Sequence, residues 1–281
     1  MTGRPVSPDD LVLTLDNPRA ERVKKVAALA GRSARSRANA LLVEGPQAVR
    51  EAVAWVPERV RDLYVSPEAR ERYHEIVADA LAAGRWVHLA SAQVVEAMSS
   101  DAQGILAVVD EAGVSLDDVL AARPRLVAVM SNVRDPGNAG TVIRAADAAG
   151  ADAVILAGEC VDPSNPKVVR SSVGSLFHIP VVRSVPLADA VAELQQAGVQ
   201  VLAADGAGTV ELGDEGADDE ALAVPTAWLL GNEAWGLSED ELALADAVVR
   251  IPIYGKAESL NLATAASVCL YASARAQRRP R

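Results

Sequence analysis

The sequence predicts an α/β protein of two domains, the second of which contains a mostly parallel sheet. Two observations predict this class. Short apolar stretches alternate with helical patterns, and strands that alternate with helices form parallel sheets covered on both faces. The alternation stops once, around Gly113 and Pro124, and then restarts. The predicted parts are an N-terminal arm (1–17), a smaller α/β domain (18–110), a linker (111–124) and a larger domain (125–281).

The smaller domain is predicted to begin with an amphipathic helix over residues 18–30. The stretch "ALLVEG" at 40–45 is typical of a short strand, and Pro46 opens the next helix because proline fits the first helical turn. The remaining predicted elements are strands at 61–66, 85–90 and 104–110 and a helix at 67–83.

The larger domain repeats this alternation over a longer stretch of chain. Its predicted strands are 125–130, 152–158, 179–184, 199–206, 227–231 and 247–253. Its predicted helices are 138–149, 165–176, 187–197, a short helix from Ser238 and a long C-terminal helix from about residue 260. Both lists together predict a sheet with helices on its two faces.

The formal net charge of −11 argues against a nucleic-acid partner, because phosphate contacts are made chiefly by Lys and Arg. Positive charge is nevertheless concentrated between Arg19 and Arg37, whereas the acidic stretch 213–220 is typical of a solvated loop. Arg32, Arg35 and Arg37 therefore have two interpretations, a solvated helix face or an RNA-contacting surface.

Cys160 and Cys269 are far apart and have no ligand-like spacing, which predicts structural thiols rather than a disulfide or a metal site. The N-terminus lacks the apolar core of a signal peptide, and no apolar run reaches membrane-spanning length. We therefore expect a cytoplasmic protein with no metal and no membrane partner.

Three loops that follow predicted strands are the first places to look for a ligand site, because ligands of parallel sheets bind outside the carboxyl ends of the strands. These loops are "SNVRDPGNAG" (131–140), "NEAWGLSEDE" (232–241) and "GKAESLNLA" (255–263). Their uncharged amides and hydroxyls, bounded by glycines, suit a ligand recognised by hydrogen bonds.

The first two loops hold polar residues that local structure explains only in part. Asn138 follows turn-forming residues and can cap the helix that begins there. Arg144 lies on that helix, where a cation gains nothing from the N-terminal dipole, so either an external anion or Asp147 is its partner. Glu233 has no local role of this kind.

In the third loop, Ser259 is the expected N-cap of the last helix. Asn261 lies one position too deep to be that cap and is left for a ligand.

Two rival enzyme classes lack their motifs. The loop 131–140 does not match the G-x-G-x-x-G fingerprint of a Rossmann-type enzyme. A Ser-His hydrolase needs a partnered histidine and a nucleophile elbow, and His74, His88 and His178 lack that context. His178, just before a predicted strand, is interpreted as structural. A non-catalytic RNA-binding protein remains the alternative.

Taken together, these segments resemble the SpoU (TrmH) family of RNA ribose 2′-O-methyltransferases. The resemblance is carried by "NVRDPGNAGTVIRAADAAG" (132–150), "LLGNEAWGLS" (229–238) and "IPIYGKAESLNLATAASVCLY" (251–271), with "NPKVVRSSVGSLFHIPV" (165–181) between the first two. The stretch "ALLVEGPQAVREAVA" (40–54) is similar to the start of the ribosomal-protein-like substrate-binding domain that many members carry.

The resemblance implies a trefoil knot in the larger domain, S-adenosylmethionine as cofactor and a homodimer. It implies that the backbone around Gly231, Ile251 and Leu260 holds the cofactor. The polar residues of the implied catalytic site are Asn138, Arg144, Glu233, Ser259 and Asn261. It also favours RNA contact by the basic stretch with Arg32, Arg35 and Arg37, and makes Lys167 and Arg170 candidates for phosphate contact.

Arg144 is expected to position the RNA phosphate for an in-line transfer. The family's proposal that this arginine removes the 2′-hydroxyl proton is weaker, because a guanidinium stays protonated. The N-terminal domain favours ribosomal RNA of the large subunit as substrate over transfer RNA.

Overall fold

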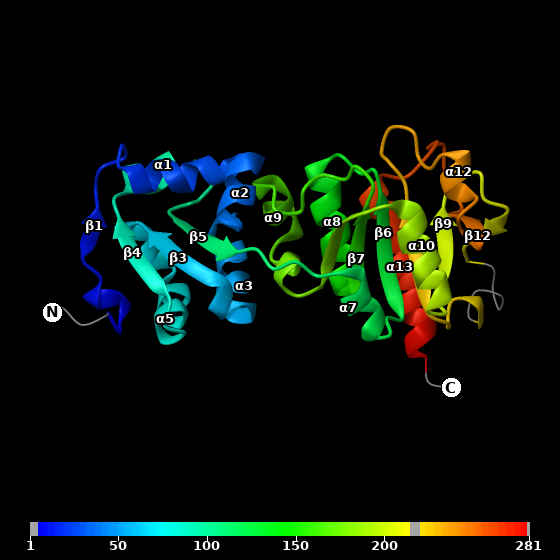
Figure 1. Cartoon of the computed structure of the whole chain (residues 1–281), viewed down its shortest axis with the longest axis horizontal. Helices are drawn as coiled ribbons and strands as arrows, with labels where there is room; N and C mark the ends of the chain where they lie inside the picture. The colour runs from blue at the N-terminus through cyan, green and yellow to red at the C-terminus, as the bar shows by residue number, and fades with distance from the viewer. Residues whose placement is uncertain (1–4, 214–219, 280–281) are drawn as a thin grey trace. The chain divides into compact units, whose positions relative to one another are not determined.

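The computed structural model describes residues 5–213 and 220–279. The chain forms two compact units, which we call the smaller and the larger domain (Figure 1). The smaller domain comprises Met1–Ala112 and Ser164–Phe177, and the larger domain comprises Gly113–Pro163 and His178–Arg281. Most of the acidic stretch predicted as a solvated loop, residues 214–219, lies outside the described residues.

A five-stranded mixed sheet in the order β1-β4-β3-β5-β2 organises the smaller domain. Its strands are β1 (Leu13–Leu15), β2 (Ala40–Glu44), β3 (Val60–Val65), β4 (Trp86–Ala90) and β5 (Ile105–Asp110). Its helices are η1 (Pro8–Asp10), α1 (Glu21–Ala27), η2 (Ala28–Ala30), α2 (Arg32–Ala38), α3 (Pro46–Trp55), η3 (Pro57–Arg59), α4 (Pro67–Arg72), α5 (His74–Ala82), α6 (Ala92–Met98), α9 (Pro166–Ser172) and η4 (Ser175–Phe177). The pairs β1–β4 and β4–β3 are parallel, whereas β5 is antiparallel to β3 and β2.

Side chains of β2 alternate between two hydrophobic cores, one on each face of this sheet. Leu41 and Val43 join the core that contains α3 and α5, and Leu42 joins the core that contains α1 and α6. Because both faces are buried, the strand is a continuous apolar run in the sequence.

The predicted arm and linker both contain structure that belongs to a domain. Within the arm, β1 pairs with β4 and Leu11 is buried in the core of the smaller domain. Within the linker, Leu116 and Val119 of α7 (Leu116–Ala121) are buried in the core of the larger domain. A three-residue strand and a six-residue helix are too short to show a hydrophobic period.

The segment Ser164–Phe177, predicted as part of the larger domain, packs instead with the smaller one. Val169 of α9 and Phe177 of η4 lie in the same core as α3 and α5. The other residues of this core precede them by 60 positions or more, so no local pattern could assign the segment.

The larger domain contains a seven-stranded sheet in the order β10-β12-β9-β11-β6-β7-β8, and every pair in it is parallel. Its strands are β6 (Leu126–Ser131), β7 (Ala153–Ala157), β8 (Val181–Val185), β9 (Gln200–Ala204), β10 (Val210–Glu211), β11 (Thr226–Leu230) and β12 (Ala247–Arg250). Besides α7 its helices are α8 (Pro136–Ala149), α10 (Leu187–Gln196), α12 (Glu239–Leu242) and α13 (Leu262–Arg278). The predicted α/β class with a parallel sheet is confirmed.

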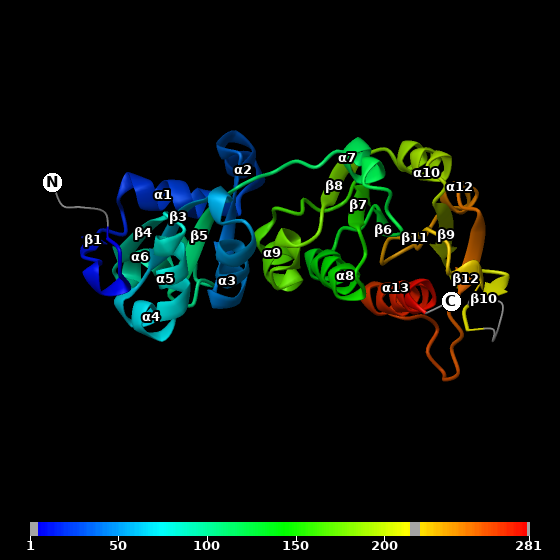
Figure 2. The same ribbon diagram turned by 90° about the horizontal axis from the view of Figure 1, so that it is seen from below.

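Helices cover both faces of this sheet. Figure 2 shows α7 and α10 on one side and α8 and α13 on the other. All six residues of β6 are buried, which accounts for its unbroken apolar sequence. Because the strands are parallel, the loops after β6, β9, β11 and β12 meet at one edge, where the candidate site lies.

Candidate active site

The loop after β6 starts helix α8 with an aspartate cap. The Asp135 carboxylate accepts a hydrogen bond from the backbone N–H of Asn138 at 2.7 Å, and Pro136 occupies the first turn. The prediction that Asn138 caps this helix is therefore wrong. Since Asp135 satisfies the helix end, the amide side chain of Asn138 is available for other contacts.

Glu233, in the loop after β11, ties that loop to the start of α8. Its carboxylate accepts hydrogen bonds from the backbone N–H groups of Arg134 at 3.4 Å and Asp135 at 3.2 Å. It also accepts one from Asn138 Nδ2 at 3.2 Å. An exposed carboxylate that binds several N–H groups at the start of a helix is favourably placed for the helix dipole.

Asn261 connects the third loop to the same point. Its Nδ2 donates to Asn138 Oδ1 at 3.0 Å, and its Oδ1 accepts from the backbone N–H of Ala263 at 2.9 Å. Asn261 is thus the N-cap of α13, and the prediction that Ser259 is the cap is wrong by two residues. The side chains of Glu233, Asn138 and Asn261 form one hydrogen-bonded chain across the three predicted loops.

A tight turn shapes the loop after β11. The backbones of Asn232 and Gly236 pair in both directions, at 3.0 and 2.9 Å. The buried side chain of Asn232 donates to the carbonyl oxygen of Asn132 at 2.6 Å and accepts from Ala234 N–H at 2.8 Å. A Cβ atom on Gly231 would lie 2.5 Å from the carbonyl carbon of Gly236, so this close approach requires glycine.

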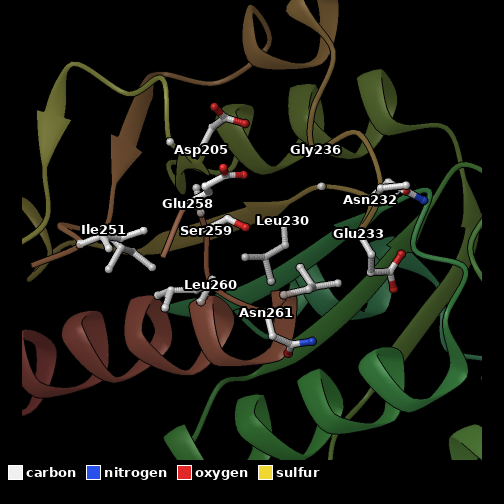
Figure 3. Close-up of a pocket in the computed structure, with 17 residues that line it drawn as sticks. Asp205, Leu230, Asn232, Glu233, Gly236, Ile251, Glu258, Ser259, Leu260 and Asn261 are labelled. Carbon is white, nitrogen blue, oxygen red and sulfur yellow. Dashed lines mark hydrogen bonds between the residues drawn. The ribbon is translucent and has the colours of Figure 1, made fainter. Parts of the chain in front are cut away.

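A pocket of about 480 Å³ opens beside this turn (Figure 3). The predicted site residues that line it are Gly231, Glu233, Ile251, Ser259, Leu260 and Asn261. Further lining residues come from the loop after β9, which the sequence interpretation did not include. The size and the mixed polar and apolar lining suit a nucleoside-sized ligand.

The charged side chains that line the pocket are all carboxylates, namely Asp205, Glu233 and Glu258. In Figure 3, Asp205 and Glu258 lie close to each other on the side opposite Glu233. Asp205 Oδ1 accepts the backbone N–H of Ala207 at 2.9 Å, which orients the side chain. The sequence interpretation missed Asp205 because it placed this residue inside the predicted strand 199–206, whereas β9 ends at Ala204 and Asp205 starts the loop.

Arg144 is an exposed residue of α8 and does not line the pocket. Among residues 5–213 and 220–279, nothing forms an ion pair or hydrogen bond with its guanidinium. The alternative partner considered from sequence, Asp147, is instead 2.9 Å from Nδ1 of His178. The structural interpretation of His178 agrees with this contact, and Arg144 is left available for an external anion.

The basic stretch of the smaller domain divides into exposed and buried arginines. Arg32 and Arg37 are exposed. Arg35 is 3% exposed, and its Nη1 donates to the carbonyl oxygens of Leu29 at 3.1 Å and Ala30 at 2.9 Å. The prediction that Arg35 contacts RNA is wrong, because its guanidinium holds the end of η2 inside the protein.

The two candidates on α9 differ in whether carboxylates of the protein already pair with them. Lys167 is exposed and available to a phosphate. Arg170 Nη1 lies 2.9 Å from Glu44 Oε2 and 2.8 Å from Asp101 Oδ2. Arg170 therefore holds α9 against the rest of the smaller domain, because its guanidinium forms ion pairs with two carboxylates there.

The exposed and the buried arginines are predicted to have different effects, the first on RNA binding and the second on the stability of the fold. Replacing Arg32 and Arg37 together by alanine should reduce the slope of log K against log salt by about 2, because each is expected to contact one phosphate. Replacing Arg35 alone should lower the free energy of unfolding by about 1–3 kcal/mol, because two carbonyls lose their donor. Salt titrations of RNA affinity and urea unfolding measure the two quantities. Equal salt slopes for the double variant and the wild type would contradict the surface assignment.

Both cysteines are shielded thiols. Burial raises the pKa of Cys160 to about 11 and that of Cys269 to about 12. Within the described residues no group of three or more His, Cys, Asp or Glu side chains is arranged to hold a metal ion. No helix in that part of the chain is long and apolar enough to cross a membrane.

Each of the two domains matches a known protein family. The chain matches the SpoU rRNA Methylase family over residues 125–271 and the RNA 2′-O ribose methyltransferase substrate binding family over residues 42–113. It is 34% identical, over 92% of its length and 97% of the relative's, to the 23S rRNA (guanosine(2553)-2′-O)-methyltransferase RlmP of Bacillus subtilis.

Two solved structures share the fold over nearly the whole chain. An AdoMet-bound rRNA methyltransferase from Sinorhizobium meliloti has a TM-score of 0.78 and 31% identity, covering 95% of this chain and 97% of that one. The SpoU methyltransferase AviRb from Streptomyces viridochromogenes, in complex with AdoMet, has a TM-score of 0.75 and 34% identity, covering 91% and 98%.

The parallel sheet, the pocket at its carboxyl edge and these likenesses define an S-adenosylmethionine-dependent methyltransferase. The chain belongs to the SpoU rRNA methylase family, as the resemblance predicted.

Proposed function

We propose that this protein transfers a methyl group from S-adenosylmethionine to the ribose 2′-hydroxyl of one nucleotide in large-subunit ribosomal RNA. The observation that carries the proposal is the hydrogen-bonded chain Glu233–Asn138–Asn261, which joins the three loops beside the pocket. The name of the Bacillus subtilis relative, a 23S rRNA 2′-O-methyltransferase, supports the substrate class. The match to a substrate-binding family in the smaller domain supports it as well.

In the proposed chemistry, one set of residues holds the cofactor and Arg144 binds the RNA. S-adenosylmethionine supplies an electrophilic methyl group. The cofactor is held in the pocket by residues that line it, namely Gly231, Ile251, Ser259 and Leu260. Arg144, exposed and without a partner in the described chain, binds the RNA phosphate and orients the 2′-hydroxyl. A guanidinium is a poor general base, so a separate acceptor takes the hydroxyl proton.

The carboxylates of the pocket suit the positive sulfonium of this cofactor. We expect Asp205→Asn to weaken S-adenosylmethionine binding by about 5-fold, the effect of losing one partly exposed charge contact. Binding of S-adenosylhomocysteine, whose sulfur is neutral, should change by less than about 2-fold. Asparagine keeps an acceptor for Ala207 N–H.

Calorimetric titration with both ligands tests this expectation. Asp189→Asn, on the exposed first turn of α10, is the matched control because it removes the same charge outside the pocket. Equal loss of affinity for the two ligands would contradict the charge argument.

The proposal also includes a homodimer, a trefoil knot in the larger domain and action in the cytoplasm, where ribosomal RNA is found. Exposed apolar side chains of the larger domain support the dimer. Val268 and Tyr271 lie on the outer face of α13, and Tyr254 is 93% exposed. The Tyr271 hydroxyl donates to the carbonyl oxygen of Ala148, so this apolar surface reaches the helix that carries Arg144.

The test of the function is methyl transfer from labelled S-adenosylmethionine to unmodified 23S rRNA, 16S rRNA and transfer RNA in parallel. Labelling of one 2′-hydroxyl in 23S rRNA is the expected result. Labelling of transfer RNA alone would contradict the ribosomal substrate and assign the enzyme to transfer RNA. Binding of the cofactor without transfer to any of the three would overturn the substrate assignment, and absence of cofactor binding would favour a non-catalytic RNA-binding protein.

A further inference from the structure

A large aromatic side chain is exposed in the loop that follows β11. Trp235 is 57% exposed, although indoles are mostly buried in folded proteins. It lies within the tight turn closed by Asn232 and Gly236, whose backbones pair with each other. The turn therefore presents the indole from a rigid backbone.

The direction of this side chain differs from that of its neighbours. Ala234 and Gly236 line the pocket, whereas Trp235 does not. Glu233, two residues earlier, belongs to the hydrogen-bonded chain that joins the three loops. The indole consequently lies outside the lining of the proposed cofactor pocket, although both of its sequence neighbours line it.

A guanidinium from another loop already faces this indole. The Arg134 Cζ atom lies 5.5 Å from the centroid of the Trp235 ring, within the range of a cation–π contact. Arg134 Nη2 is also 2.9 Å from Glu159 Oε2, and the backbone N–H of Arg134 donates to Glu233. The guanidinium of Arg134 therefore contacts both the indole and a carboxylate in this structure.

An exposed cation–π pair contributes only about 0.5–1 kcal/mol, so loop stability alone is a weak reason to expose an indole. Unpaired RNA bases stack on aromatic rings and on guanidinium planes, and each such contact is worth more. A planar cation and a planar aromatic side chain together match a base and the phosphate next to it. This chemistry fits RNA better than it fits the cofactor, which we propose binds in the pocket.

We propose that Trp235, supported by Arg134, stacks on an unpaired base of the RNA substrate beside the methylated ribose. The inference rests on the proposed function, because it takes RNA as the ligand of this edge of the sheet. Stacking accepts any base, so the pair holds the nucleotide in place and leaves base identity to other contacts. Trp235 is a substrate-positioning residue.

The first experiment measures stacking without relying on activity. In a variant with Trp55→Phe and Trp86→Phe, the remaining indoles are Trp235 and the buried Trp228. A single-stranded oligoadenylate should quench its fluorescence at low salt, and an abasic oligomer with the same number of phosphates should not. Equal quenching by both oligomers would overturn the proposal, as would no quenching by either.

The second experiment uses methyl transfer to the ribosomal RNA fragment found to be the substrate. Trp235→Ala should raise the KM for RNA by about 5- to 100-fold, while cofactor affinity stays within about 2-fold. Trp235→Phe should recover most of the loss, since it keeps an aromatic face. If cofactor affinity falls in parallel with RNA affinity, the side chain only braces the loop and the proposal fails. Absence of transfer by the wild type together with base-dependent quenching would refute the proposed function and retain the stacking contact.

Discussion

Replacing Arg144 by alanine is expected to reduce methyl transfer at least about 100-fold, because misplacing the reacting groups costs rates of this order. Affinity for S-adenosylmethionine should stay within about 2-fold of the wild type, since Arg144 does not line the pocket. The fold should also be unaffected. The side chain is exposed, and its guanidinium has no partner among the described residues.

The measurement is single-turnover transfer to ribosomal RNA beside calorimetry with the cofactor. Arg144→Lys keeps the charge but loses the planar fork, and we expect it to recover only part of the rate. Arg275→Ala, an exposed arginine in the last turn of α13, controls for the loss of one positive charge. Turnover of Arg144→Ala close to that of Arg275→Ala would show that this arginine does not position the substrate.

Replacing Gly231 by alanine is expected to have the second large effect, a loss of cofactor affinity of at least about 5-fold. The new Cβ atom would lie 2.5 Å from the carbonyl carbon and 2.6 Å from the carbonyl oxygen of Gly236. These are backbone atoms of the paired turn, so the turn must open and the pocket wall must move. Overpacking of this kind costs about 1–3 kcal/mol, which corresponds to a factor of about 5 to 150 in affinity if the whole cost falls on the bound state.

Gly255→Ala is the matched control, because a Cβ atom there would have no neighbour within 4 Å. Calorimetry with S-adenosylmethionine and urea unfolding of both variants separate a local change in the pocket from loss of the fold. Equal cofactor affinity in the two variants would mean that the close approach at Gly231 is not needed for binding.

The sequence predicted the parallel sheet and the three loops because both depend on local signals. Buried parallel strands are continuous apolar runs, and turn residues mark where they end. Glu233 was singled out since no local contact explained it, and it forms long-range contacts with the start of α8. Motif resemblance selected Gly231 and Leu260, which line the pocket.

The wrong predictions concern which side chain caps a helix and which side of a short helix is buried. Asn138 and Ser259 can each cap a helix, but Asp135 and Asn261 do so, because the cap depends on where the backbone leaves the helical conformation. Arg35 lies among exposed basic residues in the sequence but is buried in the structure. A seven-residue helix gives too little pattern to show which side faces inward.

By itself, the sequence determined the class of the fold, most of its strands and three of the loops that meet at the candidate site, since these follow from local periodicity and turn residues. Only the tertiary structure decided which side chains meet. Asn138 contacts Asn261 across 123 positions of sequence, and α9 packs with the smaller domain. Such contacts depend on how the chain closes long loops around its cores, and no local stretch of sequence contains that information.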